Sequence, residues 1–324
     1  VWEILYSRTS HLSRFGSHFP VEPGEPNVTM CNEMIDQLAD RAVERILSEM
    51  RPSAPYMAQQ AADWFTRLAG GSRPAAYFLH PLAFPMLHLP WWMEQTVDPS
   101  PDVEFQADLV YSSVNGYYFI RMIDNVMDGH STVEPKLLPM LGFFHLHFHA
   151  VYERYFPHNH PFWAQFSAIA IQSAESALRD AALTEIDLDT FVAVSGAKVA
   201  GGKIPLAAVA HRYGQPHRFD AWQAFYDRLG CWHQLYNDLF GWVKDLDHQT
   251  PSYFLSEGRR RKRPTESEGA WVIREGFAWA VELLDTWLGE LSQLAEELHS
   301  PALTGYLHQR RVRMRQQSAQ VVQM

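Results

Sequence analysis

The sequence predicts an all-α fold, on two patterns that run through its 324 residues. Apolar residues recur with helical spacing along most of the chain, and few stretches alternate with the period of two that is typical of strands. Hydrophobic residues make up 47 % of the chain, which suits a large buried core and excludes a disordered or fibrous protein. We therefore expect roughly ten to twelve helices in a single domain over residues 27–324, after an N-terminal segment of residues 1–26.

The N-terminal half begins with a loop rich in Pro and Gly, followed by an amphipathic helix up to Met50 whose apolar stripe includes Ile35 and Ile46. Further helical patterns cover Tyr56–Leu68, Pro101–Met127 and Leu137–Phe156. The apolar run Pro74–Met93 contains four prolines, so it predicts buried core and not a membrane-spanning helix. The later helical patterns are Pro161–Ala182, Asp189–Tyr213, Phe219–Leu246, Pro251–Arg261, Glu266–His299 and Ala302–Gln317.

The composition excludes several classes of function. Against 27 Lys and Arg stand 37 Asp and Glu, and the formal net charge of −10 disfavours a nucleic-acid partner. Cys31 and Cys231 lie far apart in the sequence, without a neighbouring ligand pattern, so neither a disulfide scaffold nor a Cys-type zinc site is supported. We expect a cytoplasmic protein that is not an integral membrane protein.

Two carboxylates stand one helical turn apart at the end of the predicted helix Pro101–Met127. The motif Asp-Asn-Val-Met-Asp places Asp124 and Asp128 at positions i and i+4, on one face of a helix. Like charges so close repel each other, and among apolar neighbours the cost rises unless a cation compensates it. The motif therefore predicts a divalent-metal site.

A second polar motif, Asn-Asp-Leu-Phe-Gly-Trp-Val-Lys-Asp, lies within the predicted helix Phe219–Leu246. Asn237, Gly241 and Asp245 stand at i, i+4 and i+8, so Asn237 and Asp245 face the same way, about 12 Å apart along the axis. Oxygen ligands of this kind suit Mg²⁺, which binds through a few carboxylates, several waters and substrate phosphates. The two motifs together predict a Mg²⁺ site more strongly than either does alone.

These motifs resemble those of the class I isoprenoid-diphosphate enzymes, and terpene synthases most closely. Asp124 to Asp128 is similar to their aspartate-rich motif, with Asn125 in the second place. The second motif is similar to their Asn-Asp-Leu-x-Ser-x-x-Lys-Glu pattern, with Gly241 in the place of Ser and Asp245 in the place of Glu. The family's Arg-Tyr pair near the C-terminus is missing. The resemblance, which covers about residues 102–255, implies a single-domain helical bundle around a central apolar cavity.

The resemblance also implies the chemistry. Asp124, with Asp128, would bind two Mg²⁺ ions, and Asn237 and Asp245 would bind a third, with a water in place of the hydroxyl that Gly241 lacks. Three ions would hold the diphosphate of a linear prenyl substrate, and its departure would leave an allylic carbocation in a dry, aromatic cavity. The expected catalytic residues are Asp124, Asn237 and Asp245. Aromatic candidates for the cavity wall are Tyr117, Tyr118, Trp232 and Phe240.

Cationic side chains near the motifs are candidates for binding the substrate. Arg121 precedes Asp124 by one turn, as an Arg precedes an aspartate motif in squalene and phytoene synthases, and an ion pair with Asp124 is the equal alternative. The segment 195–210 resembles the Lys-containing kinked helix of chain-building prenyl transferases, which would bring Lys198 or Lys203 near the diphosphate. The expected substrate-binding residues are Arg121, Lys198, Lys203, Lys244, Tyr117 and Phe240.

Other polar clusters have simpler interpretations. Of the alternating residues His145, His147 and His149, only the first and third share a helix face, which favours a surface pair over a zinc site. His233 shares the face of the second motif and is either a hydrogen-bond donor beside the metal or a core histidine. The basic run 259–263 is either a solvated surface or a latch over an anionic ligand.

Three functions follow from these patterns. The first is a Mg²⁺-dependent terpene synthase that closes the carbocation into a hydrocarbon or alcohol. The second is a prenyl transferase that joins the cation to a second isoprenoid or another acceptor, and the third is a non-catalytic helical isoprenoid-binding protein. The clustered carboxylates argue against the third, because a mere binder does not need them. The sequence is compatible with a homodimer.

Overall fold

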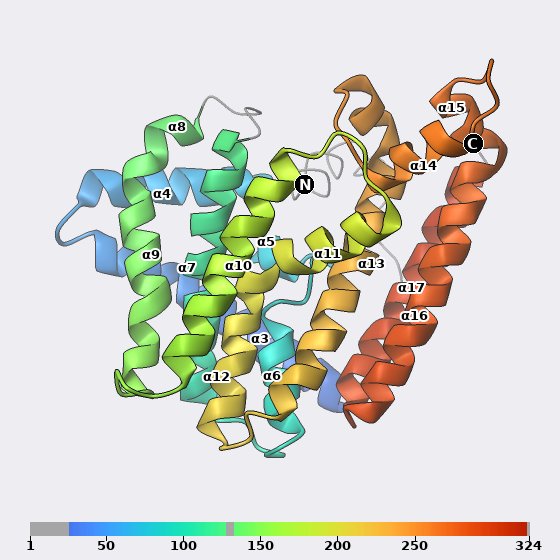
Figure 1. Ribbon diagram of the computed structural model, residues 1–324. Helices are drawn as coiled ribbons and strands as arrows, with labels where there is room; N and C mark the ends of the chain where they lie inside the picture. Colours follow the sequence, from blue (N-terminus) through green and yellow to red (C-terminus); the bar gives the residue numbers. More distant parts are fainter. Residues whose placement is uncertain (1–25, 128–132, 323–324) are drawn as a thin grey trace. The chain divides into compact units, whose positions relative to one another are not determined.

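The computed structural model describes residues 26–127 and 133–322, with side chains described over 32–127 and 133–321. Every regular element in these ranges is a helix, and no strand occurs in them (Figure 1). The all-α prediction is confirmed. The predicted N-terminal segment lies outside the described residues apart from Pro26, where the first helix begins, and Asp128 of the first motif also lies outside them.

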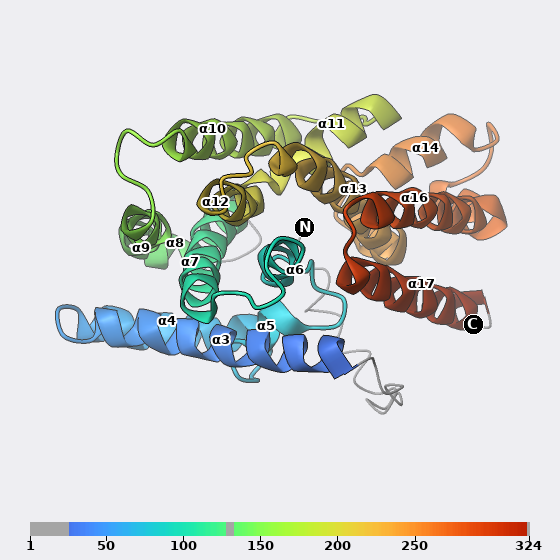
Figure 2. The ribbon, with the colours of Figure 1, turned by 90° about the horizontal axis from the view of Figure 1, so that it is seen from below.

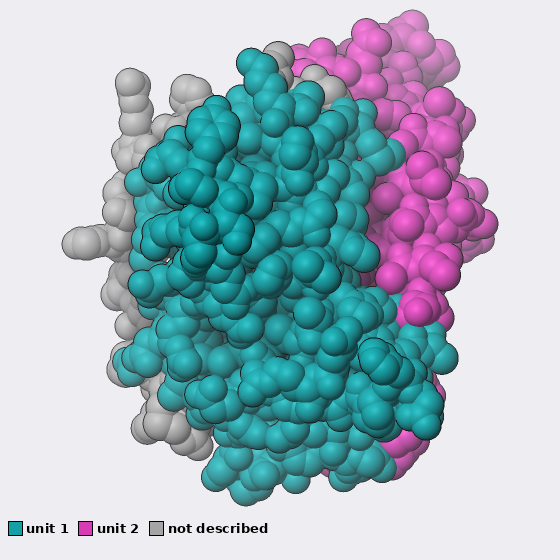
Figure 3. All heavy atoms as spheres, turned by 90° about the vertical axis from the view of Figure 1, so that its left-hand side faces the viewer, with its two compact units in different colours: residues 1–166, 204–215 teal, residues 167–203, 216–324 magenta. Residues whose placement is uncertain are grey.

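The chain divides into two compact units (Figure 3). Unit 1 comprises residues 1–166 and 204–215, and unit 2 comprises residues 167–203 and 216–324. The single domain around a central cavity therefore stays a prediction. The first motif belongs to unit 1 and the second motif belongs to unit 2.

Unit 1 is organised around the long helix α7, Val103–Met127. Figure 2 shows α3, α6, α9 and α12 around it, and each of them packs against α7. Most of α7 is therefore buried, including polar positions such as Gln106 and Asn115. The other elements of this unit are α3 (Pro26–Met50), α4 (Pro55–Leu68), α5 (Ala76–Leu79), α6 (His88–Gln95), α8 (Glu134–Leu137), η1 (Leu138–Met140), α9 (Leu141–Ala150), η2 (Val151–Arg154), the first turn of α10 (Phe162–Ala181) and α12 (Ile204–Arg212).

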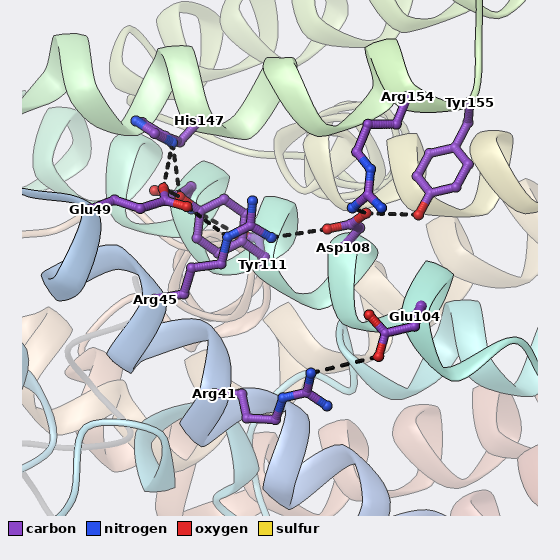
Figure 4. A network of polar contacts seen from close by, with 10 residues as sticks. Arg41, Arg45, Glu49, Glu104, Asp108, Tyr111, His147, Arg154 and Tyr155 are labelled. Atoms are coloured by element: carbon purple, nitrogen blue, oxygen red, sulfur yellow. Dashed lines mark hydrogen bonds and ion pairs between the residues drawn. The ribbon is translucent and has the colours of Figure 1, made fainter.

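Polar contacts fix the N-terminal half of α7 (Figure 4). Asp108 has a side chain only 4 % exposed, and it accepts hydrogen bonds from Arg45 of α3 at 3.0 Å and from the Tyr155 hydroxyl at 2.7 Å. Arg154 of η2 forms an ion pair with the same carboxylate. Because a buried carboxylate is costly unless it is paired and hydrogen-bonded, these partners join α3 and η2 to one position of α7.

Unit 2 is organised around α13, Arg218–Asp247, which packs against α11, α14 and α16. Close approach to α11 depends on glycine: a Cβ on Gly230 would lie 3.0 Å from Val199 Cγ2, and one on Gly196 would lie 3.1 Å from Asp227 Cβ. The other elements are most of α10, α11 (Leu188–Lys198), η3 (Ala200–Lys203), α14 (Tyr253–Arg261), α15 (Glu268–Trp271), the π-helical turn η4 (Val272–Gly276), α16 (Phe277–Glu297) and α17 (Pro301–Val322).

Two predicted helices are wrong in the same way, because each is broken. The region Leu137–Phe156 contains η1, α9 and η2 in place of one helix, with α8 and Pro139 at its start. The region Asp189–Tyr213 ends α11 at Lys198, passes through the short 3₁₀ helix η3 and resumes as α12. Glycines inside η3 and proline at the second position of α12 disfavour a continuous helix there.

The apolar run Pro74–Met93 is core, as predicted. It forms the short helices α5 and α6, and its large side chains are buried, with Leu89 at 0 % and Trp91 at 6 % exposure. Among the described helices, none is by itself long and apolar enough to cross a membrane. The consecutive segments Leu188–Lys198 and Ala200–Arg212 pass that test of length and composition only when they are counted together.

Candidate functional site

The described part of the first motif, residues 124–127, lies in the last turn of α7. Asp102 caps the other end of this helix, since its Oδ1 accepts hydrogen bonds from the backbone N–H groups of Glu104 and Phe105, both at 3.1 Å. Gly116, midway along, lets α9 approach closely, because a Cβ there would lie 2.8 Å from Phe148 Cδ2. The helix thus has a fixed start and a fixed middle, and it carries Asp124 at its C-terminal end.

Asp124 lies beside a buried arginine. The distance from Arg121 Nη1 to Asp124 Oδ2 is 3.7 Å, with side-chain exposures of 2 % for Arg121 and 14 % for Asp124. The ion pair that the sequence allowed is therefore present. Tyr117, one turn earlier, is hydrogen-bonded through its hydroxyl to Tyr77, and burial raises its pKa well above the usual value for a phenol. Tyr117 is accordingly a neutral side chain next to this charged pair.

Asn125, in the second place of the motif, points to a different partner. Its Nδ2 donates to Glu134 Oε1 of α8 at 3.1 Å, and Trp64 Nε1 of α4 donates to the same oxygen at 2.9 Å. All three residues are buried, at 3 %, 5 % and 1 % exposure for Asn125, Glu134 and Trp64. The amide of Asn125 thus ties the end of α7 to two other helices of unit 1.

The second motif contributes three buried polar side chains on α13. Asn237, Asp238 and Asp245 of α13 are 2 %, 3 % and 4 % exposed. Burial, followed by the charge of Asp245, raises the pKa of Asp238 to about 8, while the hydrogen bond from Gln234 Nε2 at 2.7 Å acts in the opposite direction. The carboxyl group of Asp238 therefore takes up a proton more readily than an exposed carboxyl group does.

The buried oxygen Oδ1 of Asn237 has no hydrogen-bond partner within the part of the chain that the structure describes. A buried oxygen without a partner costs about 1–3 kcal/mol of folding free energy. A ligand bound to this oxygen would offset that cost. A hard cation is such a ligand, since Mg²⁺ prefers carboxylate and amide oxygens and completes its shell with water and phosphate. The side chains of Asn237 and Asp245 fit this requirement. Within the described ranges, no three His, Cys, Asp or Glu residues gather as a metal cluster of their own.

The structure separates the two lysines of the kinked segment. Lys203 is 1 % exposed and forms an ion pair with Asp227 of α13. Asp227 precedes Asn237 by ten residues, which is about 15 Å along a helix axis. Lys198 instead contacts Asp180 of α10, with 2.5 Å between Nζ and Oδ2. Asp180 is close enough to Asp238 to help raise its pKa, so Lys198 is the lysine near the second motif.

Two of the remaining predicted residues of α13, Lys244 and Phe240, lie nearer the surface. Lys244 is partly exposed, as is Phe240, whose ring packs against Tyr236 at a centroid distance of 4.7 Å and against Phe277 at 5.9 Å. Trp232 is fully buried, and its Nε1 donates to the backbone oxygen of Leu284. Trp232 is therefore core in this unit.

A basic residue that the sequence did not single out lies against α13. Arg310 of α17 is 2 % exposed, its Nε donates to the Tyr306 hydroxyl at 2.7 Å, and its guanidinium stands 6.0 Å from the centroid of the Trp232 ring. Burial, with the charge of Arg310, lowers the pKa of His233 to about 3. His233 is thus a neutral, buried histidine. The spacing of Tyr306 and Arg310 at i and i+4 could have predicted that they share a helix face.

The other polar clusters of the sequence serve local packing. In the basic run, Arg260 donates to the backbone oxygen of Ile186 at 2.6 Å, and Arg261 pairs with Glu257 and stacks over Trp279. These contacts account for Arg260 and Arg261, and the latch over an anionic ligand stays a prediction. On α9, His145 packs against the ring of Phe119, whereas His149 stands 3.7 Å from Glu153.

No protein-family model matches the chain, and no curated protein matches its sequence. Among solved structures, it is similar to the geranylgeranyl pyrophosphate synthetase from the archaeon Geoglobus acetivorans, with a TM-score of 0.68. The match covers 89 % of this chain and 98 % of that chain at 13 % sequence identity. The chain shares that protein's all-helical fold. The all-helical fold implied by the two motifs is thereby confirmed.

Proposed function

We propose that this chain is an isoprenoid-diphosphate enzyme that ionises a linear prenyl diphosphate in a Mg²⁺-dependent reaction. The observation that carries the proposal is the buried group Asn237, Asp238 and Asp245 on α13, with an unpartnered amide oxygen and a raised carboxyl pKa. Polar groups so placed in an apolar helix are costly in a purely structural role, and perturbed pKa values gather at functional sites. Asp124, at the end of a second buried helix, supplies the other half of the pattern.

The two motifs would hold the metal ions. Asp124 and Asp128 would bind two Mg²⁺ ions and Asn237 and Asp245 a third, as the family resemblance implies. When bound, Mg²⁺ supplies charge neutralisation of the departing diphosphate. The role that we propose for Arg121 is to orient Asp124 and to donate to diphosphate oxygens from its buried position.

Among the lysines, Lys198 is the stronger candidate for a diphosphate contact. It pairs with Asp180 beside the second motif, whereas the ammonium of Lys203 is held by Asp227. Lys244, partly exposed on the motif helix itself, is the second candidate. Tyr117 and Phe240 would present ring faces to the allylic cation, each stabilising it by about 0.5–2 kcal/mol.

We further propose that the cation cyclises, giving a hydrocarbon or alcohol. The support is the second motif, in which Asn237, Asp238, Leu239 and Lys244 match the terpene synthase pattern. The alternative is a prenyl transferase, and two observations favour it: the solved structure of the same fold is named a geranylgeranyl pyrophosphate synthetase, and Lys198 lies at a helix break like that of the chain-building enzymes.

One experiment tests the proposal and separates its two forms. The purified chain is incubated with C10, C15, C20 and C25 prenyl diphosphates, singly and in pairs with isopentenyl diphosphate, with and without Mg²⁺. Release of diphosphate together with a cyclic product from a single substrate supports the cyclase. Product that forms only with an acceptor supports the transferase, and binding without any diphosphate release would contradict both.

A further inference from the structure

A buried carboxylate braces the end of α7. Glu134 Oε1 accepts one hydrogen bond from Asn125 and one from Trp64, so α7, α8 and α4 meet at a single oxygen atom. These contacts lie within unit 1 and are almost fully shielded from solvent. At low local dielectric such hydrogen bonds are strong, and the loss of one leaves a buried polar group without a partner.

The hydrogen bond between Asn125 and Glu134 affects the residue that precedes Asn125, which is Asp124. Asp124 and Asn125 both belong to the last turn of α7 that the structure describes. Asn125 follows Asp124 directly, so a contact that holds the Asn125 side chain also holds the backbone from which the Asp124 carboxylate projects.

The brace also explains why the second residue of the motif is Asn and not Asp. The amide of Asn125 donates a hydrogen bond, whereas an ionised Asp can only accept. An aspartate at this position would turn an acceptor toward Glu134, and two carboxylates would then face each other in a buried place. Such a pair repels, or one member must take up a proton. The identity of Asn125 is therefore matched to Glu134.

We infer that Asn125 is a positioning residue: through Glu134 and Trp64 it holds the last turn of α7 so that Asp124 is aimed to bind a Mg²⁺-diphosphate. This inference rests on the proposed function. It assigns to Asn125 the role of an anchor and not of a metal ligand, and it makes Glu134 the hydrogen-bond acceptor for that anchor although Glu134 lies outside both motifs.

The test exchanges the amide and the carboxylate between positions 125 and 134. Asn125→Asp should weaken binding of inorganic diphosphate in the presence of Mg²⁺, measured by calorimetry, by about 10- to 100-fold, because a misplaced binding group costs on that order. Glu134→Gln should keep near wild-type binding, since its amide oxygen still accepts from Asn125 and Trp64. The double variant Asn125→Asp with Glu134→Gln should recover most of the loss, because the new amide can donate to the new carboxylate.

A matched control lies at the other end of the same helix. Gln106 Nε2 donates to Glu94, and both residues are 0 % exposed. Gln106→Glu therefore makes the same amide-to-carboxylate change against a buried carboxylate, but 18 residues before Asp124, about 27 Å along the axis. It should lower the melting temperature, as Asn125→Asp should, and leave the diphosphate affinity and the Mg²⁺ requirement unchanged.

Three results would overturn the inference: wild-type affinity in Asn125→Asp, no recovery in the double variant, or an equal loss of affinity in Gln106→Glu. Failure of the proposed function gives a different result. If the variants bind Mg²⁺-diphosphate in the predicted order of affinity but the wild-type chain releases no diphosphate from any prenyl substrate, the positioning role of Asn125 is supported and the proposed enzymatic function is contradicted.

Discussion

Replacing Asn237 by leucine should make the metal-free protein more stable while it removes the activity. The side chain is 2 % exposed, and its Oδ1 has no hydrogen-bond partner among the described residues. Leucine has nearly the same shape and no polar atom, so Asn237→Leu removes a buried unsatisfied acceptor, which is worth about 1–3 kcal/mol. Loss of the same oxygen removes one expected Mg²⁺ ligand, so diphosphate release should stop.

The expected shift in melting temperature follows from the size of the chain. Unfolding entropy is about 2.1 cal/mol/K per residue, which gives about 0.7 kcal/mol/K for 324 residues melting as one cooperative unit. A gain of about 1–3 kcal/mol then raises the melting temperature by roughly 1–4 °C. Calorimetry in the presence of a chelator measures the shift, and diphosphate release with excess Mg²⁺ measures the activity.

Asn237→Asp is the matched control. It keeps an oxygen ligand at the same place, so it should retain Mg²⁺-dependent turnover. It also adds a third buried carboxylate beside Asp238 and Asp245, which should lower the stability of the metal-free chain. If Asn237→Leu instead destabilises the metal-free chain, or keeps its Mg²⁺-dependent activity, the assignment of Asn237 as a ligand is refuted.

Three further predictions concern the same helices. Asp124→Ala should abolish turnover with nearly unchanged helical content by circular dichroism; wild-type activity that survives exhaustive chelation would contradict the metal assignment. Gly241→Leu should block the ion without unfolding the chain, and Gly241→Ser should be tolerated and shift the Mg²⁺ requirement; a Mg²⁺ titration unchanged by Gly241→Leu would show that this position is mere packing. The pKa of His233, lowered to about 3 by burial and by Arg310, gives a contribution to stability that is present above about pH 6.5 and is lost as the pH falls toward 3. Urea denaturation should show that the free energy of unfolding falls by about 2 kcal/mol between pH 7 and pH 5, and His233→Gln should remove this fall. If the variant shows the same pH dependence of unfolding free energy as the wild type, the lowered pKa of His233 is not its cause.

The two motif helices could be predicted because their signals are local. The expected ranges Pro101–Met127 and Phe219–Leu246 differ by at most two residues at each end from α7 and α13. Apolar spacing and the lack of internal proline determine such a helix from its own residues. The burial of the second motif follows from the same pattern, since its polar side chains stand among apolar residues of the same helix.

The break between α11 and α12 depends on residues that are distant in the sequence. A Cβ on Gly202 would lie 2.0 Å from the hydroxyl oxygen of Tyr226, which itself donates to the backbone oxygen of Val199. Gly202 is therefore needed for the close approach of η3 to α13. A helical pattern that contains glycines can equally well continue, and only the partner on α13 decides that this one stops.

The same dependence on distant partners explains which candidate site residues could be chosen from the sequence and which could not. The sequence pattern alone identifies the candidates Asp124, Asn237 and Asp245, because ionisable or polar groups recur there at helical spacing in apolar surroundings. The choice between Lys198 and Lys203 needs Asp180 and Asp227, which lie 18 and 24 positions away from their respective lysines. A sequence shows that a buried charge must be compensated, but the compensating group is known only once the fold brings it there.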